Sequence, residues 1–403
     1  MATLSEQIQN MKTASQEQTA ASQALAQEVS GKMGAIDAKV NSSIGRVESE
    51  YAAKAAGLTI IATDGYRKAV EHNSGGKNTV VYDAQGNPNI MVVVPRFNYE
   101  DLELPGLELG TGIPTMFQTN GVPRGEVLIG KYLASTMGTG TAVIGGVQPR
   151  TSVNFDQAKE LCTRKGANWH LFSAHEQAAI AFWSIANGTV PRGNTNYGRS
   201  HERKLETSRR FDNGIPGDTS GTGRTDTGKG PATWNHDHTD FGIADLVGNV
   251  SEWVDQLMLQ DGRIITTLDN DPSIAEENWT KLAAYLDATT SSGGSLILNS
   301  EMLNRQGDAG DDGSTKELYL EWQKLTKDPS YEPNELLRRL LIEPAIAEGH
   351  ATGRLYARNA GKRFPLRGGN WYSGAHAGLG CLYLSNSRVN AYSIIGFRPA
   401  LFV

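Results

Sequence analysis

Apolar residues in the first 56 positions recur at spacings of three and four residues. The apolar positions are Leu4, Ile8, Met11, Leu25, Val29, Met33, Ile36, Val40, Ile44, Val47 and Tyr51. Polar residues at Ser15, Gln18 and Ser22 interrupt the pattern. A sustained 3–4 spacing is typical of a coiled coil, and the alternative is a single amphipathic helix docked on a neighbouring subunit. Residues 1–56 are therefore predicted to be a helical coiled-coil stalk or attachment segment.

The pattern changes to short apolar runs at 79–82 and 90–94. Turn-forming residues flank both runs, at 73–76 (Asn-Ser-Gly-Gly) and 83–88 (Asp-Ala-Gln-Gly-Asn-Pro). Such an arrangement is typical of a β-hairpin. We interpret residues 57–95 as a small β connector.

From residue 96 onward the chain combines strands punctuated by Gly and Pro with two predicted helices. The first helix begins near Asn154 and places Phe155 and Ala158 on one face, and the second covers 174–186. Residues 192–240 contain few aliphatic side chains and are predicted to form a long loop.

Residues 270–360 contain further helical patterns, at 316–327 and 334–342. We interpret 270–360 as an insertion packed on a head that spans 96–403. Helices and strands mixed in this way predict an α+β fold.

Composition and charge narrow the class of protein. The chain has 403 residues, 45 of them Gly, and a net charge of −6, so no basic field favours nucleic acid. No apolar run is long enough to span a bilayer, and the N-terminus lacks the pattern of a signal peptide. We expect synthesis in a cytoplasm, no partner nucleic acid and no membrane insertion. The two cysteines, Cys162 and Cys381, are too few for a disulfide framework.

Residues 367–403 have structurally demanding ends and an irregular middle. The segment begins Arg-Gly-Gly-Asn-Trp and ends near Gly-Phe-Arg-Pro-Ala-Leu. The residues between these two motifs include Tyr, Ser, His, Cys, Asn and Ile in no periodic order. The ends have residue types typical of a structural framework. The middle lacks the apolar periodicity of a buried segment and is therefore expected at the surface. This division indicates a binding site on a rigid fold.

Metal and nucleotide sites have weaker support. Residues 234–240 (Trp-Asn-His-Asp-His-Thr-Asp) contain enough ligand types for a metal ion. A structural cation and a solvated loop are both compatible with this short cluster, and the sequence assigns no metal ligands. Residues 138–146 are rich in Gly but lack the Lys and the spacing of a phosphate-binding loop.

Several separated motifs resemble the formylglycine-generating-enzyme branch of the C-type lectin fold. They are Ile-Gly-Lys-Tyr at 129–132, Gly-Asn-Val-Ser-Glu-Trp at 248–253, Arg-Gly-Gly-Asn-Trp at 367–371 and Gly-Phe-Arg at 396–398. The resemblance implies a C-type lectin head in which the motif residues form the scaffold. The scaffold residues are Gly248, Asn249, Trp253, Arg367, Gly368, Gly369, Trp371, Gly396, Phe397 and Arg398.

Enzymes of that branch use two cysteines a few residues apart, shortly before the Gly-Phe-Arg motif. This chain has only Cys381 in that stretch. One thiol cannot supply a two-thiolate copper site, so we expect a protein that is not an enzyme. A formylglycine-type oxidase is the third-ranked interpretation.

The stretch from Gly369 to Leu401 resembles the variable region of diversity-generating retroelement proteins, especially phage tail-tip receptor binders. Their template codons are commonly AAC, and changes at either adenine give Tyr, Ser, His, Cys or Ile. The resemblance implies that 367–403 is a variable region with nine ligand-binding positions. These positions are Tyr372, Ser373, His376, Cys381, Tyr383, Ser385, Tyr392, Ser393 and Ile394.

The resemblance also implies a place and partners. We expect a homotrimer in the virion, at the tail tip or fibre, that binds a host cell-surface receptor and contacts other tail proteins through its N-terminal stalk. No cofactor is expected, although many relatives hold a structural calcium. The alternative is a bacterial lectin-like ligand-binding protein that is not carried on a virion.

Overall fold

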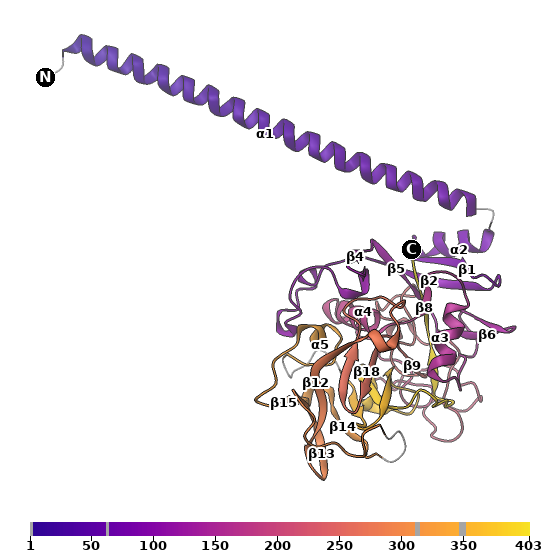
Figure 1. Cartoon of the computed structure of the whole chain (residues 1–403). Coiled ribbons are helices and arrows are strands. Elements are labelled where there is room, and N and C mark those ends of the chain that lie inside the picture. Colours follow the sequence, from indigo (N-terminus) through magenta and orange to yellow (C-terminus); the bar gives the residue numbers. More distant parts are fainter. Residues whose placement is uncertain (1–2, 62–63, 311–314, 346–351) are drawn as a thin grey trace. The chain divides into compact units, whose positions relative to one another are not determined.

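The computed structural model describes residues 3–61, 64–310, 315–345 and 352–403. The chain divides into two compact units, Met1–Lys68 and Ala69–Val403. In the first unit, the helix α1 runs from Leu4 to Ile61 without interruption (Figure 1). The predicted long N-terminal helix is therefore present, and it ends five residues beyond the predicted boundary at 56.

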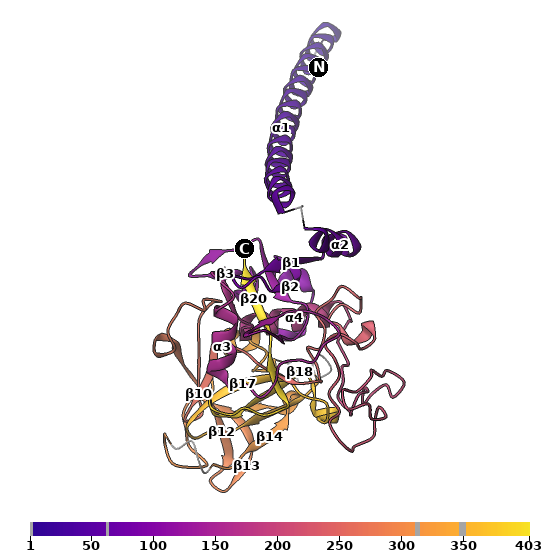
Figure 2. The ribbon, with the colours of Figure 1, turned by 90° about the vertical axis from the view of Figure 1, so that its right-hand side faces the viewer.

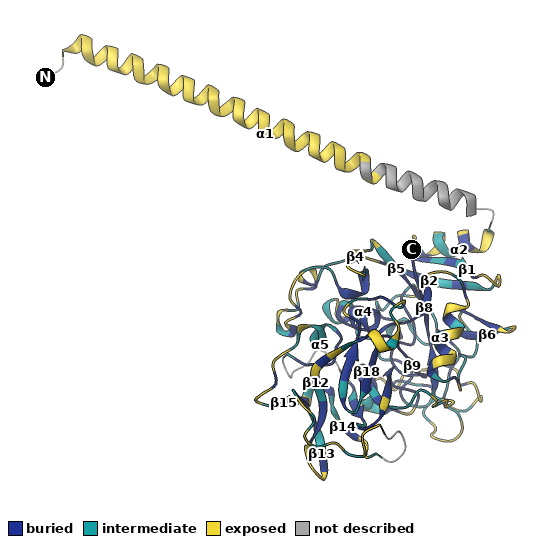
Figure 3. Ribbon diagram, viewed as in Figure 1, coloured by how far each residue is buried: buried dark blue, intermediate teal, exposed yellow. Residues whose placement is uncertain are grey.

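Every side chain described in α1 is exposed (Figure 3). The apolar seam is included, with Val29 and Val40 each 48% exposed and Met33 60% exposed. The assembly of this seam into a coiled coil remains a prediction. In the described parts of the chain, no helix has both the length and the apolar character needed to cross a membrane.

The second unit contains two main sheets. The described residues form a five-stranded sheet in the order β1-β2-β5-β20-β8. Its strands are β1 (Asn78–Tyr82), β2 (Pro88–Pro95), β5 (Glu126–Gly130), β20 (Pro399–Phe402) and β8 (Trp169–Leu171). Since β2 pairs with β5, and β5 with β20, the hairpin predicted within 57–95 shares a sheet with the C-terminal strand.

The larger sheet has eleven strands among the described residues, and β17 and β18 lie near its middle (Figure 2). Its main path is β14-β16-β18-β17-β10-β11-β12-β13-β15, and β9 joins β17 to β19. The bounds are β14 (Leu318–Glu321), β16 (Arg354–Ala357), β18 (Gly378–Asn386), β17 (Lys362–Gly368), β10 (Leu257–Gln260), β11 (Arg263–Thr266), β12 (Thr280–Thr290), β13 (Gly293–Asn299), β15 (Thr326–Lys327), β9 (Ser251–Trp253) and β19 (Ile395–Phe397).

Two small hairpins and four short helices complete the described elements. The hairpins are β3 (Gln118–Thr119) with β4 (Val122–Pro123), and β6 (Ser135–Met137) with β7 (Gly140–Ala142). The helices are α2 (Gly65–Ser74), α3 (Phe155–Thr163), α4 (Ala174–Ala186) and α5 (Glu335–Arg339). The helices predicted from Asn154 and over 174–186 are confirmed as α3 and α4.

Both of these helices begin with a capping box. The Asn154 side chain accepts from the Gln157 N–H, and the Ser173 side chain accepts from the Glu176 N–H. In each box the third helical residue bonds back to the cap, which satisfies two backbone donors. The two starts are therefore fixed by local sequence.

The helical pattern predicted at 316–327 is wrong. This segment contains β14, a short 3₁₀ turn at Trp322–Lys324, and β15. Leu318 is buried and Tyr319 is exposed, which is the two-residue alternation of a strand. Pairing of β14 with β16 decides this conformation. The helix predicted at 334–342 is confirmed only in its first part, as α5.

One large apolar core joins the two sheets. It includes Val127 and Ile129 of β5, Leu257 of β10, Leu382 of β18 and Ile180 of α4. Described parts of the 270–360 segment also enter this core, through β12, β13, β14, α5 and β16. The core therefore extends beneath the strand that carries the predicted variable positions.

Candidate functional site

A surface pocket of about 370 Å³ lies beside β18 and the turns that follow it. Five of the nine predicted ligand-binding positions line it, although they span 372–394 in the sequence. These five are Tyr372, Tyr383, Ser385, Tyr392 and Ile394, and the other lining residues are Ser251, Glu317, Arg358, Arg363, Leu366, Asn370, Asn386, Ser387, Asn390 and Ile395. We call this cavity the C-terminal pocket.

The other four predicted positions do not line this pocket. Ser373 is buried, and its Oγ accepts a hydrogen bond of 2.9 Å from the Asn370 N–H. His376 is half-buried in a 3₁₀ turn, and Ser393 is exposed with its carbonyl accepting from Arg224 Nη1. Cys381 is completely buried, and burial raises the pKa of its thiol to about 12. The Cys381 side chain is thus covered by neighbouring residues and is not part of the pocket surface.

Tyr372 and Tyr392 present aromatic surface at the rim of the pocket. Their side chains are 50% and 52% exposed. The Tyr372 ring makes an edge contact with Trp371, with ring centroids 5.8 Å apart. Tyr392 Oη accepts a hydrogen bond of 3.0 Å from Asn390 Nδ2. Both rings are oriented by neighbours yet remain open to solvent, which suits contact residues.

Tyr383 forms a wall of the pocket and is held much more firmly. Its ring stacks on Tyr356 of β16, with centroids 4.1 Å apart and planes 7° from parallel. Burial raises the pKa of the Tyr383 hydroxyl. The register explains the stack, because Tyr356 and Tyr383 are directly paired in parallel strands. This tyrosine therefore contributes both to packing and to the pocket surface.

The sequence analysis missed the part of the pocket that lies outside 367–403. Glu317 immediately precedes β14, and Arg358 immediately follows β16. The signal was present as strand alternation, since Leu318, Leu355 and Ala357 are all buried between the side chains that face outward. It was hidden by the wrong helical prediction at 316–327.

The predicted scaffold residues are buried around the pocket. Gly248 (φ +77°) and Gly368 (φ +84°) adopt backbone conformations that favour glycine. A Cβ on Gly248 would collide with the carbonyl of Asn194, and one on Gly368 with the carbonyl of Leu246. These two glycines let neighbouring backbones approach closely beneath the pocket.

Buried polar bonds link the other scaffold residues. Asn249 is fully buried, its Oδ1 accepts from the Thr225 N–H at 3.0 Å, and its carbonyl accepts from the Trp371 N–H at 3.1 Å. Trp253 is also fully buried and donates from Nε1 to the Val153 carbonyl at 3.0 Å. The backbone before Tyr372 is consequently fixed by interior contacts.

A buried ion pair lies where β5, β9 and β20 meet. Arg398 is fully buried and donates to both carboxylate oxygens of Glu252, at 2.8 and 2.9 Å. Its remaining donors reach the carbonyls of Gly130 and Ala244, each at 2.7 Å. Phe397 is buried in the adjacent core. The other buried scaffold residues are Arg367, Gly369 and Gly396.

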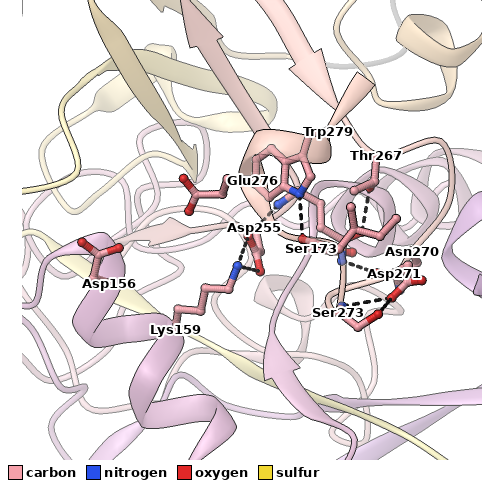
Figure 4. Close-up of polar contacts among 12 residues, drawn as sticks. Asp156, Lys159, Ser173, Asp255, Thr267, Asn270, Asp271, Ser273, Glu276 and Trp279 are labelled. Carbon is pink, nitrogen blue, oxygen red and sulfur yellow. Dashed lines mark hydrogen bonds and ion pairs between the residues drawn. The ribbon is translucent and has the colours of Figure 1, made fainter. Parts of the chain in front are cut away.

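A charged network anchors the loop that follows β18. Lys159 of α3 pairs with Asp255 at 3.0 Å (Figure 4). Arg388 of the loop pairs with Glu276 at 2.7 Å and with Asp156 of α3 at 3.5 Å, and it lies over the Phe364 ring. These bonds connect the loop to α3 and to the 270–360 segment, which positions Asn390 and Tyr392.

The cluster predicted at 234–240 is used mainly for local structure. His236 Nδ1 accepts from the Ile243 N–H, and the Asp237 carboxylate accepts from the N–H and the hydroxyl of Thr239. His238 Nε2 contacts the carbonyl of Val190. Among residues 3–61, 64–310, 315–345 and 352–403, no three His, Cys, Asp or Glu side chains are grouped to hold a metal ion.

No protein-family model matches the chain, and no curated protein sequence matches it. Several solved structures are similar over most of its length. Treponema denticola variable protein 1 has 13% identity and a TM-score of 0.29, covering 80% of this chain and 98% of its own. PvdO from Pseudomonas aeruginosa also has 13% identity and a TM-score of 0.29, covering 81% of this chain and 98% of its own.

The Major Tropism Determinant P3c variant has 14% identity and a TM-score of 0.29. This match covers 80% of the chain and 71% of the determinant. TM-scores this low do not establish a common fold, so the function proposed below depends on the geometry of the C-terminal pocket.

Proposed function

We propose that this chain is a diversifiable receptor-binding protein with a C-type lectin-like head, and that it recognises a host cell-surface ligand at a phage tail tip. The observation that carries the proposal is the C-terminal pocket. Five of the nine positions that the resemblance to variable regions indicates line one cavity.

The division between scaffold and pocket supports the same function. Buried bonds of Asn249, Trp253 and Arg398 hold the framework, while Tyr372 and Tyr392 project from it half-exposed. Side chains at the rim can therefore change without removing interior contacts. Tyrosine provides a broad contact area with little rotamer entropy to lose, and serine provides adaptable hydrogen bonds.

The geometry favours binding over catalysis. Cys381 is buried with its thiol pKa at about 12, so the reactive thiolate is scarce near neutral pH. The other cysteine, Cys162, is also buried, and burial raises its thiol pKa. We infer a protein that acts without a cofactor and is not an enzyme.

The N-terminal helix supports an assembled form. Its exposed apolar seam, from Leu25 to Val47, needs a partner surface to leave water. We infer that three copies pair through α1, and that the same stalk contacts other tail proteins in the virion. Several heads on one particle would raise the effective affinity for a cell surface by roughly 10²–10⁴.

Sequencing this gene in a population grown from one clone tests the proposed function. We expect substitutions concentrated in the codons of Tyr372, Tyr383, Ser385, Tyr392 and Ile394, at template adenines, with fewer in the codon of buried Cys381. Codons for Gly368, Gly369 and Arg398 serve as the internal control. Uniform codons throughout 367–403 would instead favour a lectin-like protein with a fixed ligand.

Replacing Tyr372 and Tyr392 together by Ser is expected to leave the fold nearly as stable as before. Both rings are half-exposed, so each change should cost less than about 1 kcal/mol of unfolding free energy. Adsorption to host cells should be lost, because the rim contacts disappear. Urea denaturation and a binding assay with labelled protein on host cells provide the two measurements.

Tyr383→Ala is the matched comparison within the same pocket. Because Tyr383 stacks on Tyr356, its loss should cost more than about 2 kcal/mol. Equal stability losses in the two variants would show that Tyr372 and Tyr392 are core residues, and would contradict their assignment to the binding rim.

A further inference from the structure

The C-terminal pocket has a constant side formed by strands outside the predicted variable region. The pair Tyr356–Tyr383 sets the register of β16 and β18, and the Arg358 N–H extends the ladder by donating to the Leu384 carbonyl at 3.1 Å. Two residues beyond that pair, Arg358 and Ser385 therefore lie side by side on the face that lines the pocket. Antiparallel pairing of β14 with β16 brings Glu317 to the same row.

Arg358 differs from the other arginines of this face. Arg354 pairs with Glu321 at 2.9 Å, and Arg388 pairs with Glu276 at 2.7 Å. Within the described ranges, by contrast, the Arg358 side chain has no ion pair. Its buried Nε, like that of Arg388, has no hydrogen-bond acceptor. A buried donor without an acceptor costs free energy, and a ligand that supplies an acceptor recovers it.

Ser385 adds a second unsatisfied group at the same place. Its Oγ is buried and has no partner in the described parts of the chain. Arg363 also lines the pocket, with its Nε donating to the Ala360 carbonyl at 2.9 Å. The charged residues of the described lining are Arg358, Arg363 and Glu317.

The rest of the lining suits a sugar ring. The cavity of about 370 Å³ is in the range of small-molecule sites, roughly 300–1,000 Å³. Tyr372 and Tyr392 offer aromatic faces, while the side chains of Asn386, Ser387 and Asn390 offer polar groups that can bond to hydroxyls.

We propose that the C-terminal pocket binds the acidic group of a cell-surface saccharide, a carboxylate or a phosphate, through the Arg358 guanidinium and the Ser385 hydroxyl. This deepens the proposed function and rests on it. A guanidinium presents paired donors that match two oxygens of either anion. Since Arg358 is outside 367–403, every diversified form retains it. All diversified forms then share the preference for an anionic group. The residues at the neighbouring variable positions determine which acidic saccharide is bound.

Calorimetric titration of the full chain at low ionic strength tests this inference. The probes are glucuronate for the carboxylate, glucose 6-phosphate for the phosphate, and glucose as the uncharged match. We expect one of the two acids to bind at least about tenfold more tightly than glucose, since a charged hydrogen bond has that effect. The acid that binds shows whether the pocket recognises a carboxylate or a phosphate. Added salt should weaken the binding of that acid.

The Arg358→Gln variant should lose at least about tenfold in affinity for that acid while melting at the same temperature, because the side chain has no internal partner to lose. Arg209→Gln, at an exposed arginine outside the pocket, is the control and should bind normally. If Arg358→Gln does not fold, Ser385→Ala provides the second test, with a smaller loss expected.

Three results would overturn the inference: equal affinity for glucose and both acids, no binding of any probe, or unchanged acid binding by Arg358→Gln and Ser385→Ala. The codon experiment remains independent. Codon variation without acid binding would reject only the acidic ligand, whereas acid binding without codon variation would indicate a fixed anion-binding lectin and reject the diversified receptor binder.

Discussion

Replacing Arg398 by Met is expected to lower the free energy of unfolding by about 3–5 kcal/mol, because the change leaves Glu252 as a buried charge without its partner. The same change removes the donors to the carbonyls of Gly130 and Ala244. These acceptors lie in different parts of the head, so Arg398 ties the small sheet to the motif at 248–253. Urea denaturation followed by circular dichroism measures the loss.

The loss should grow as the pH rises. Burial already raises the pKa of the Glu252 carboxyl, and Arg398 opposes this rise. Without Arg398 the folded-state pKa increases further above the unfolded value. The folded variant then binds a proton that the unfolded chain has released, so its stability falls as pH increases above about 4.5. We expect a smaller deficit at pH 5 than at pH 8.

Arg209→Met is the control for this prediction. The Arg209 side chain is exposed and bonds only locally, to Asn213 Oδ1. Its replacement should change the unfolding free energy by less than about 0.5 kcal/mol at either pH. A similarly small effect for Arg398→Met would show that the buried ion pair does not hold the motif together.

Serine at Met33, Ile36 and Val40 together is expected to convert the assembled protein to single chains of 43.5 kDa. These side chains are 60%, 59% and 48% exposed along one seam of α1. Association of copies would bury the seam. Three polar substitutions would remove most of the hydrophobic free energy gained in the half of the seam that polar residues do not interrupt. Analytical ultracentrifugation measures the mass, and a trimer is expected before the change.

Serine at Gln27, Ala35 and Ala38 provides the matched control. Helical geometry places these three positions away from the seam, so the control variant should keep its trimeric mass. A wild-type chain that sediments as a monomer would reject the coiled-coil prediction and favour docking of α1 on another protein. An unchanged mass in the Met33, Ile36 and Val40 variant would show that the seam is not the contact.

Part of the candidate site could be inferred from the residue types and the resemblance of 369–401 to a variable region. Tyr372, Tyr383, Ser385, Tyr392 and Ile394 were selected without any geometry and line one cavity. Cys381 could not be separated from them, because two-residue alternation places it on the same face of β18 as Tyr383 and Ser385. Its burial is decided by the packed sheet and by Arg367 and Arg354 nearby.

The sequence by itself determined the features that depend on near neighbours. The 3–4 periodicity specified α1, and the capping boxes at Asn154 and Ser173 specified where α3 and α4 begin. Glycines in the motifs marked the tight backbone approaches at Gly248 and Gly368. Each of these signals acts within a few residues, through helix geometry, capping bonds or the absence of a Cβ.

Only the tertiary structure decided which distant strands meet. Parallel pairing of β16 with β18 joins residues about 27 positions apart in the chain, and antiparallel pairing with β16 makes residues 318–321 the strand β14. That pairing places Arg358 beside Ser385 and completes the pocket. Strand pairing depends on burial and long-range hydrogen bonds rather than on local propensity, so no short stretch of sequence could specify it.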